Sequence, residues 1–150
     1  MVTVDEIMTT SVTTLPDTAT LEDAMRLMTE KNIRHIPVLD DNDKLAGLAT
    51  QRDVLAATDS TLRGKEERVS PADIPLSHVM TKKVVTVDIH TSLLGAARYL
   101  HQHKYGCLPV VSEGKLKGIV TDSDFVAVAI NLLEQVDMAE QPEDYLETED

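Results

Sequence analysis

The sequence contains few of the residues on which several common folds and chemistries depend. Its 150 residues include a single cysteine, Cys107, no tryptophan and only 3% aromatic residues. One cysteine excludes an intrachain disulfide and a cysteine-based metal cluster. No apolar run is long enough to cross a bilayer, and the first residues, MVTVDEIMTT, lack the basic start and apolar core of a signal peptide. The chain is therefore expected to be globular and cytoplasmic, with a core of aliphatic side chains and no membrane contact.

Basic residues are absent from one end of the chain. Residues 1–117 carry all 14 Lys and Arg against 16 Asp and Glu, whereas residues 118–150 carry 10 acidic residues and no Lys or Arg. The net charge of −12 therefore lies mostly in the final segment. Nucleic-acid binding normally requires a basic face, so this distribution argues against a nucleic-acid partner.

A set of motifs occurs twice, with a period near 72 residues. Three pairs of segments match: IMTTSVTTL (7–15) with VMTKKVVTV (79–87), IRHIPVLD (33–40) with YGCLPVVS (105–112), and GLATQRD (47–53) with GIVTDSD (118–124). The last pair is one residue closer because the preceding turn, DDNDK in the first copy, is shortened to SEGK in the second. Two copies of this length predict a two-lobed domain with internal pseudo-symmetry.

Each copy is expected to fold in the order β-α-β-β-α. Apolar residues at helical spacing in LEDAMRLM and LLGAARYL mark the first helix of each copy, with Thr20 and Thr91 as the N-caps. The fold class is therefore α/β (α+β), with two pseudo-symmetric repeats packed together. The expected boundaries are repeat 1 at 1–58, a polar linker at 59–76, repeat 2 at 77–137 and a flexible acidic tail at 138–150.

The T-x-x-D phrase closes the last strand of each copy and opens the following helix. As a structural feature, Thr50 with Asp53, and Thr121 with Asp124, can form a helix-capping box. As a binding feature, a helix N-terminus attracts phosphate, a threonine hydroxyl can donate to it, and an aspartate can accept from ribose hydroxyls. The glycine three residues before each threonine is expected to let a ligand approach the strand. The two interpretations are compatible.

The ordered set M-T-x-x-V, R-H-I-P-V and G-h-h-T-x-x-D, where h is apolar, is duplicated over residues 3–137. It resembles a tandem pair of CBS domains, also called a Bateman module. The resemblance implies regulatory binding of an adenosine-containing ligand (AMP, ADP, ATP or S-adenosylmethionine) in two clefts between the repeats. It also implies a homodimer, an effector protein that the sequence does not identify, and no catalytic cofactor.

In that family the threonine contacts phosphate and the aspartate contacts ribose, which implies one cleft at Thr50 and Asp53 and another at Thr121 and Asp124. The first cleft is expected to include Thr13, Thr14, Arg34, His35, Ile36, Pro37 and Arg52. The second is expected to include Val85, Thr86, Tyr105, Gly106, Cys107, Leu108, Pro109 and Ser123.

The two copies differ in charge beside the T-x-x-D phrase. The first copy has Arg34 and Arg52, where the second has Gly106 and Ser123, and it has no acid at the position of Asp122. Arginine suits phosphate, whereas a fixed carboxylate repels it. We therefore expect the GLATQRD side to hold a phosphorylated nucleotide. The GIVTDSD side is expected to bind a less charged adenosyl ligand, to bind weakly or to stay empty.

Other chemistries receive little support. His101 and His103 lie two apart on a predicted helix and point to different faces, which argues against a metal site. The sequence has no P-loop, nucleophile elbow or metalloprotease motif, so we expect no enzyme activity. The main alternative is a structural dimerisation module whose T-x-x-D phrases only cap helices. Catalysis is a weaker third alternative.

Overall fold

The fold consists of two similar lobes, each with a small three-stranded sheet. A computed structural model describes residues 1–63 and 69–148 of the chain, with the side chains of residues 1–59 and 69–140. The first lobe contains β1 (Leu15–Pro16), α1 (Leu21–Lys31), β2 (His35–Leu39), β3 (Leu45–Thr50) and α2 (Gln51–Arg63). The second contains β4 (Val87–Asp88), α3 (Leu93–His103), β5 (Cys107–Ser112), β6 (Lys115–Thr121) and α4 (Asp122–Thr148).

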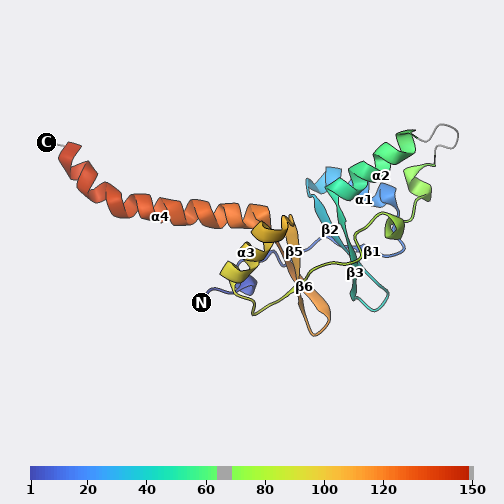
Figure 1. The fold of residues 1–150 in the computed structure, drawn as a ribbon, viewed down its shortest axis with the longest axis horizontal. Helices are drawn as coiled ribbons and strands as arrows, with labels where there is room; N and C mark the ends of the chain where they lie inside the picture. The colour runs from blue at the N-terminus through green and yellow to red at the C-terminus, as the bar shows by residue number, and fades with distance from the viewer. Residues whose placement is uncertain (64–68, 149–150) are drawn as a thin grey trace.

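Both sheets have the same topology, which confirms the duplicated β-α-β-β-α order. The first strand pairs in parallel with the second, and the second pairs antiparallel with the third, in the orders β1-β2-β3 and β4-β5-β6. Figure 1 shows the two sheets side by side, with both hairpin tips pointing in the same direction and the helices toward the other end. The predicted mixed α/β class is therefore confirmed.

The first helix of each lobe begins at a side-chain cap. In α1, the Thr20 N–H donates to Asp23 Oδ2 at 2.9 Å and the Asp23 N–H donates to Thr20 Oγ1 at 3.3 Å, as the sequence predicts. In α3 the cap is Ser92, whose Oγ accepts from the Gly95 N–H at 2.9 Å, so the prediction of Thr91 is wrong by one residue. Thr91 is unavailable because its hydroxyl accepts from a backbone N–H of the preceding turn.

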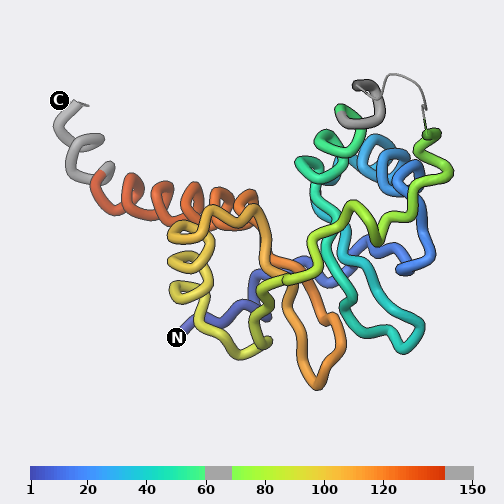
Figure 2. Tube along the Cα trace, turned by 45° about the vertical axis from the view of Figure 1, so that its right-hand side comes forward, coloured from blue at the N-terminus to red at the C-terminus, as the bar shows by residue number. Residues whose placement is uncertain are grey.

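The lobes exchange the segments that precede their first strands. The N–H and C=O of Thr9 bond to the C=O and N–H of Ile119 on β6, both at 3.0 Å. In the same way, Thr81 exchanges a pair of 2.9 Å bonds with Leu48 on β3. Figure 2 shows the blue N-terminal trace beside the second lobe before it enters the first. The packed lobes therefore differ from the sequence repeats, because each contains a segment of the other repeat.

This exchange explains the glycine that precedes each T-x-x-D phrase. A Cβ atom on Gly47 would lie 2.6 Å from Met80 Sδ, and one on Gly118 would lie 2.6 Å from Met8 Sδ. The same Cβ atoms would meet the carbonyl oxygens of the crossing segments at 2.9 and 2.8 Å. The expectation that these glycines make room for a ligand is therefore wrong: they make room for the chain itself.

The last helix extends well beyond the boundary expected from the sequence. We expected repeat 2 to end at residue 137 and a flexible tail to follow, but α4 continues to Thr148. Residues 132–140 include Leu, Met, Ala, Gln and Glu, which favour helix even without tertiary contacts. Figure 1 shows α4 projecting away from both lobes. Its large exposed apolar side chains are Val126, Ile130, Leu132, Leu133, Val136 and Met138, with exposures of 52–68%.

The segment between the repeats also contains more structure than the expected linker. α2 continues to Arg63, five residues past the predicted end of repeat 1, and short 3-10 turns form at Pro71–Asp73 and Leu76–His78. Leu76 is fully buried in the core of the first lobe. Residues 64–68 of the linker and 149–150 of the tail lie outside the described residues. Within the described chain, no helix is both long and apolar enough to cross a membrane.

Candidate functional site

Each T-x-x-D phrase forms a reciprocal capping box. The Thr50 N–H donates to Asp53 Oδ2 at 3.2 Å, and the Asp53 N–H donates to Thr50 Oγ1 at 3.1 Å. Thr121 and Asp124 make the equivalent pair of bonds at 2.8 and 3.4 Å. The capping interpretation is therefore confirmed in both copies. It leaves the remaining lone pairs of these oxygens for other partners, and Asp53 Oδ2 also accepts from the Thr81 hydroxyl at 3.1 Å.

The helix N-termini are less open to a ligand than the sequence indicates. The first helical N–H, on Gln51 in α2, donates to the Arg34 carbonyl at 2.9 Å, and its equivalent on Asp122 in α4 donates to the Gly106 carbonyl at 3.0 Å. In α4 the Asp122 carboxylate also accepts from the Ser123 N–H at 2.9 Å. The second repeat therefore places its own carboxylate at the helix start, where a phosphate would otherwise be favoured.

Two cavities flank the boundary between the lobes, and each combines residues of both repeats. The Thr121 cavity has a volume of about 240 Å³, and the Thr50 cavity has one of about 370 Å³. The Thr121 cavity is lined by Thr9, Ser11, Val12, Thr13, Asn32, Ile33, Arg34, His35, Ile119, Thr121, Asp122 and Ser123. The Thr50 cavity is lined by Arg34, His35, Leu48, Thr50, Gln51, Arg52, Asp53, Thr81, Lys104, Tyr105, Gly106, Cys107 and Asp122.

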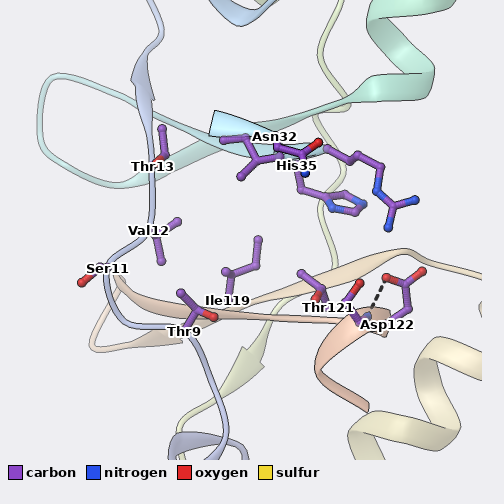
Figure 3. A pocket seen from close by; sticks show the side chains of 12 residues that line it. Thr9, Ser11, Val12, Thr13, Asn32, His35, Ile119, Thr121 and Asp122 are labelled. Carbon is purple, nitrogen blue, oxygen red and sulfur yellow. Dashed lines mark hydrogen bonds between the residues drawn. The ribbon is translucent and has the colours of Figure 1, made fainter. Parts of the chain in front are cut away.

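Each T-x-x-D phrase shares its cavity with residues of the other repeat, which differs from the arrangement expected from the sequence. We expected the Thr50 phrase to share a cleft with the first-repeat strand and the Thr121 phrase with the second-repeat strand. Instead, the Thr121 cavity joins its phrase to Thr13 of the first repeat, and the Thr50 cavity joins its phrase to Tyr105 and Cys107 of the second. Figure 3 shows His35 pointing across the Thr121 cavity toward Thr121 and Asp122. Because the crossing depends on how the lobes pack, the repeat pattern alone does not reveal it.

Several residues expected at the clefts lie elsewhere. Ile36, Pro37, Leu108 and Pro109 are fully buried in the sheets. Thr14 lines a separate cavity of about 210 Å³ near the hairpin tips. Val85, Thr86 and Asp124 line neither the Thr50 cavity nor the Thr121 cavity.

Both cavities also have lining residues that were not expected from the sequence but occupy equivalent positions of the repeat. They form equivalent pairs, one member in each cavity: Thr9 with Thr81, Asn32 with Lys104, and Ile119 with Leu48. Ser11, Val12 and Ile33 also line the Thr121 cavity. Asp122, whose carboxylate the sequence already indicated beside the second phrase, lines both cavities, and its counterpart Gln51 lines the Thr50 cavity. Aligning the two copies position by position would have brought most of these residues to attention.

The cavities differ in charge. The Thr50 cavity is lined by three cationic side chains, Arg34, Arg52 and Lys104, by two carboxylates, Asp53 and Asp122, and by the aromatic ring of Tyr105. Tyr105 stacks on His103, with ring centroids 5.7 Å apart, so its ring is held by a neighbour. In the Thr121 cavity, Arg34 is the one Lys or Arg side chain among the described lining residues, and it is accompanied by Asp122.

Two residues that line the cavities, His35 and Cys107, have shifted pKa values. Burial lowers the pKa of His35 below 6.5, with a further lowering by Arg34 and an opposing effect of the Asp122 carboxylate. Burial, supported by Asp122, raises the pKa of the Cys107 thiol to about 12. These shifts favour a neutral imidazole and a protonated thiol at neutral pH. Among the described residues, no cluster of His, Cys, Asp and Glu could hold a metal ion.

Comparison with known proteins agrees with this architecture. The CBS domain family model matches residues 4–60 and 76–131. A CBS domain-containing protein of Dictyostelium discoideum is 32% identical over 139 residues, covering 90% of this chain and 96% of the relative. Other relatives are longer: the chain spans 41% and 42% of the proteins it matches from Methanocaldococcus jannaschii and Thermofilum pendens.

Two solved structures have the same fold. A Vibrio cholerae protein provisionally named AcuB, for acetoin utilization, is 44% identical with a TM-score of 0.78, covering 92% of this chain and 97% of the other. The protein CBSX2, crystallised in complex with AMP, is 31% identical with a TM-score of 0.75, covering 88% and 98%.

Proposed function

The chain belongs to the CBS domain family and contains two such domains, and we propose that it is a regulatory module for an adenosine-containing ligand. AMP, ADP, ATP and S-adenosylmethionine are the candidate ligands. The observation that carries the proposal is the pair of composite cavities, each opening beside a T-x-x-D helix start. The AMP complex of the related CBSX2 supports the choice of ligand class.

The Thr50 cavity is the better site for a phosphorylated nucleotide. The Thr50 hydroxyl would donate to phosphate, Arg52 and Lys104 would offset its charge, and Asp53 would accept from the ribose hydroxyls. Tyr105 would stack on the adenine ring, since an aromatic face held by a neighbouring ring can bind a flat base at little cost in conformational entropy.

The Thr121 cavity suits a less charged adenosyl ligand. Asp122 already occupies the helix start, and its carboxylate would repel a di- or triphosphate. Asp122 also lines the Thr50 cavity, but there Arg52 and Lys104 would offset its charge. A charge-assisted hydrogen bond lost at such a site costs about 1.5–3 kcal/mol. S-Adenosylmethionine carries a sulfonium in place of phosphate and would meet no such repulsion. Thr13, Thr121 and Ser123 would supply its polar contacts.

Signalling would follow from the composite nature of both cavities. A ligand that contacts both repeats stabilises one arrangement of the lobes, and thereby shifts the population of assembly states or effector complexes. We place the protein among regulators rather than enzymes, as a cytoplasmic homodimer. The exposed apolar side chains of α4 are the natural contact for a second copy or for an effector protein.

A thermal-shift titration tests the proposal. AMP, ADP, ATP, S-adenosylmethionine and NADH are each added over a range of concentrations, because a ligand that binds only the folded state raises the melting temperature with concentration. We expect at least one adenosyl ligand to raise the melting temperature and guanosine monophosphate to have little effect. Absence of any shift across the panel would overturn the proposal.

A structural dimerisation module is the second candidate function. It is favoured by the reciprocal capping boxes, which satisfy Thr50, Asp53, Thr121 and Asp124 without a ligand, and by the apolar surface of α4. Size-exclusion chromatography with light scattering, run with and without the ligand panel, separates the two. A dimer indifferent to all ligands supports the structural candidate.

A further inference from the structure

The two cavities are adjacent and share three side chains. Arg34, His35 and Asp122 line both of them. Perfect twofold repeats would contribute such residues in equivalent pairs, but the position equivalent to Arg34 is Gly106, which lines the Thr50 cavity alone. A single guanidinium therefore lies where twofold symmetry would place two.

The packing at the boundary explains why the second arginine is missing. The imidazole of His35 lies against Gly106 so closely that a Cβ atom there would be 2.6 Å from His35 Nε2. An arginine at position 106 would displace this ring from the boundary between the lobes. The asymmetry between the repeats is therefore built into the contact between them.

Among the residues whose side chains the structure describes, no carboxylate forms an ion pair with Arg34. Its side chain is exposed, and the one salt bridge among the described residues joins Arg26 to Asp23 at 3.0 Å, neither of which lines either cavity. Asp122, the acidic side chain common to both cavities, accepts from the Ser123 N–H of its own helix. The Arg34 guanidinium is thus free to turn toward phosphate in either cavity.

We infer that Arg34 couples the two cavities, so that a phosphorylated ligand in the Thr50 cavity weakens phosphate binding in the Thr121 cavity. When Arg34 turns toward the first phosphate, Asp122 faces the other cavity without a compensating charge. By thermodynamic linkage, a ligand in the Thr121 cavity lowers the phosphate affinity of the Thr50 cavity by the same factor. This inference rests on the proposed function, and it adds a specificity-determining role for one residue.

Calorimetric titration with AMP measures the coupling. In the wild type, the second binding step reports the Thr121 cavity while the Thr50 cavity is filled. In Thr50→Val, or in Asp53→Ala if that variant folds poorly, the same cavity is measured while its neighbour is empty. We expect binding to be on the order of ten- to hundredfold tighter when the neighbour is empty, the effect of one charge-assisted hydrogen bond.

Two substitutions and one ligand serve as controls. In Arg34→Gln, the Thr121 cavity should bind AMP with the same affinity whether the Thr50 cavity is filled or empty. Arg52→Gln removes a cation that lines only the Thr50 cavity, so it should weaken AMP binding there. Filling the Thr50 cavity should still weaken AMP binding in the Thr121 cavity of this variant. Adenosine, which lacks phosphate, should show no coupling in any variant.

The outcomes separate this inference from the proposed function. Three results would each overturn the coupling. The AMP affinity of the Thr121 cavity could be the same whether the Thr50 cavity is filled or empty, or it could still differ between these states in Arg34→Gln. The Thr121 cavity could also bind no AMP even when the Thr50 cavity is disabled. All three leave the proposed function standing. Failure of the wild type to bind AMP or any other adenosyl ligand would overturn both.

Discussion

Replacing Gly47 with alanine should destabilise the protein by disturbing the exchanged segment. The added Cβ would meet Met80 Sδ at 2.6 Å and the Thr81 carbonyl oxygen at 2.9 Å. The methionine side chain can rotate away, but the carbonyl cannot move freely because it accepts a 2.9 Å hydrogen bond from the Leu48 N–H on β3. Relief of the contact must therefore lengthen a bond that joins the two repeats.

The size of the effect follows from overpacking. Inserting a methyl group into a well-packed site costs about 1–3 kcal/mol, and we expect a value near the middle of that range because one of the two contacts is rigid. For a chain of this length, about 2 kcal/mol corresponds to a fall in melting temperature of roughly 4–8 °C. Urea unfolding followed by circular dichroism gives the free energy directly.

Two further variants identify the cause. Gly47→Ala combined with Met80→Ala removes the sulfur contact and leaves the carbonyl contact, so a double-mutant cycle should recover part of the loss. Gly95→Ala is the control, because its Cβ would meet only Ser92 Oγ at 2.8 Å. Moving that hydroxyl breaks the α3 cap, a loss of about 1 kcal/mol, but alanine favours helix over glycine by a similar amount, so the net cost should be much smaller. If Gly47→Ala were as stable as the wild type, the close approach described here would be refuted.

Three other predictions concern reactivity, pH and assembly. Because its pKa is raised to about 12, the buried Cys107 thiol should react with a maleimide at pH 8 only after denaturant is added; rapid labelling of the native protein would contradict this. The pKa of His35 is lowered from 6.5 by burial, so its contribution to stability is present above that value and is lost as pH falls below it. The fall in unfolding free energy from pH 7.5 to pH 5 should therefore be smaller in His35→Gln, and an unchanged pH profile would argue against a half-buried neutral imidazole. If the proposed homodimer forms through α4, Ile130→Glu should yield a monomer by light scattering, whereas Leu94→Glu, which alters a similarly exposed side chain on α3, should leave it a dimer; a dimer in both variants would contradict this contact.

The sequence predicted the fold well because its signals are local and duplicated. The capping pair Thr20 and Asp23, the apolar helix stripes and the two T-x-x-D phrases each determine structure within a few residues. The cap at Ser92 was missed because Thr91 has an equally suitable hydroxyl, and only the geometry of the preceding turn selects between them.

The composition of the cavities could not be predicted in the same way. Which strand faces which helix start depends on long-range packing, and the exchange of the segments around Thr9 and Thr81 has no signature in one repeat taken alone. Gly47 was misread for the same reason, because a glycine that admits a neighbouring chain has the same sequence pattern as one that admits a ligand.

The charge difference between the copies was visible in the sequence, but its location was not. Arg52 lies in the Thr50 cavity as expected, whereas Arg34 and Asp122 lie on the boundary and belong to both cavities. The sequence assigns these charges to two separate clefts, whereas in the structure Arg34 and Asp122 belong to both cavities.

We propose that the Thr50 cavity is the nucleotide site, and AMP titration of two matched variants distinguishes it from the Thr121 cavity. Asp53→Ala and Asp124→Ala each remove a reciprocal capping bond, so both should lose a similar amount of stability. Asp53 lines the Thr50 cavity, whereas Asp124 lines neither cavity. We predict that Asp53→Ala abolishes the tighter AMP step in calorimetry and that Asp124→Ala retains it. Loss of that step in Asp124→Ala, with retention in Asp53→Ala, would place the nucleotide outside the Thr50 cavity.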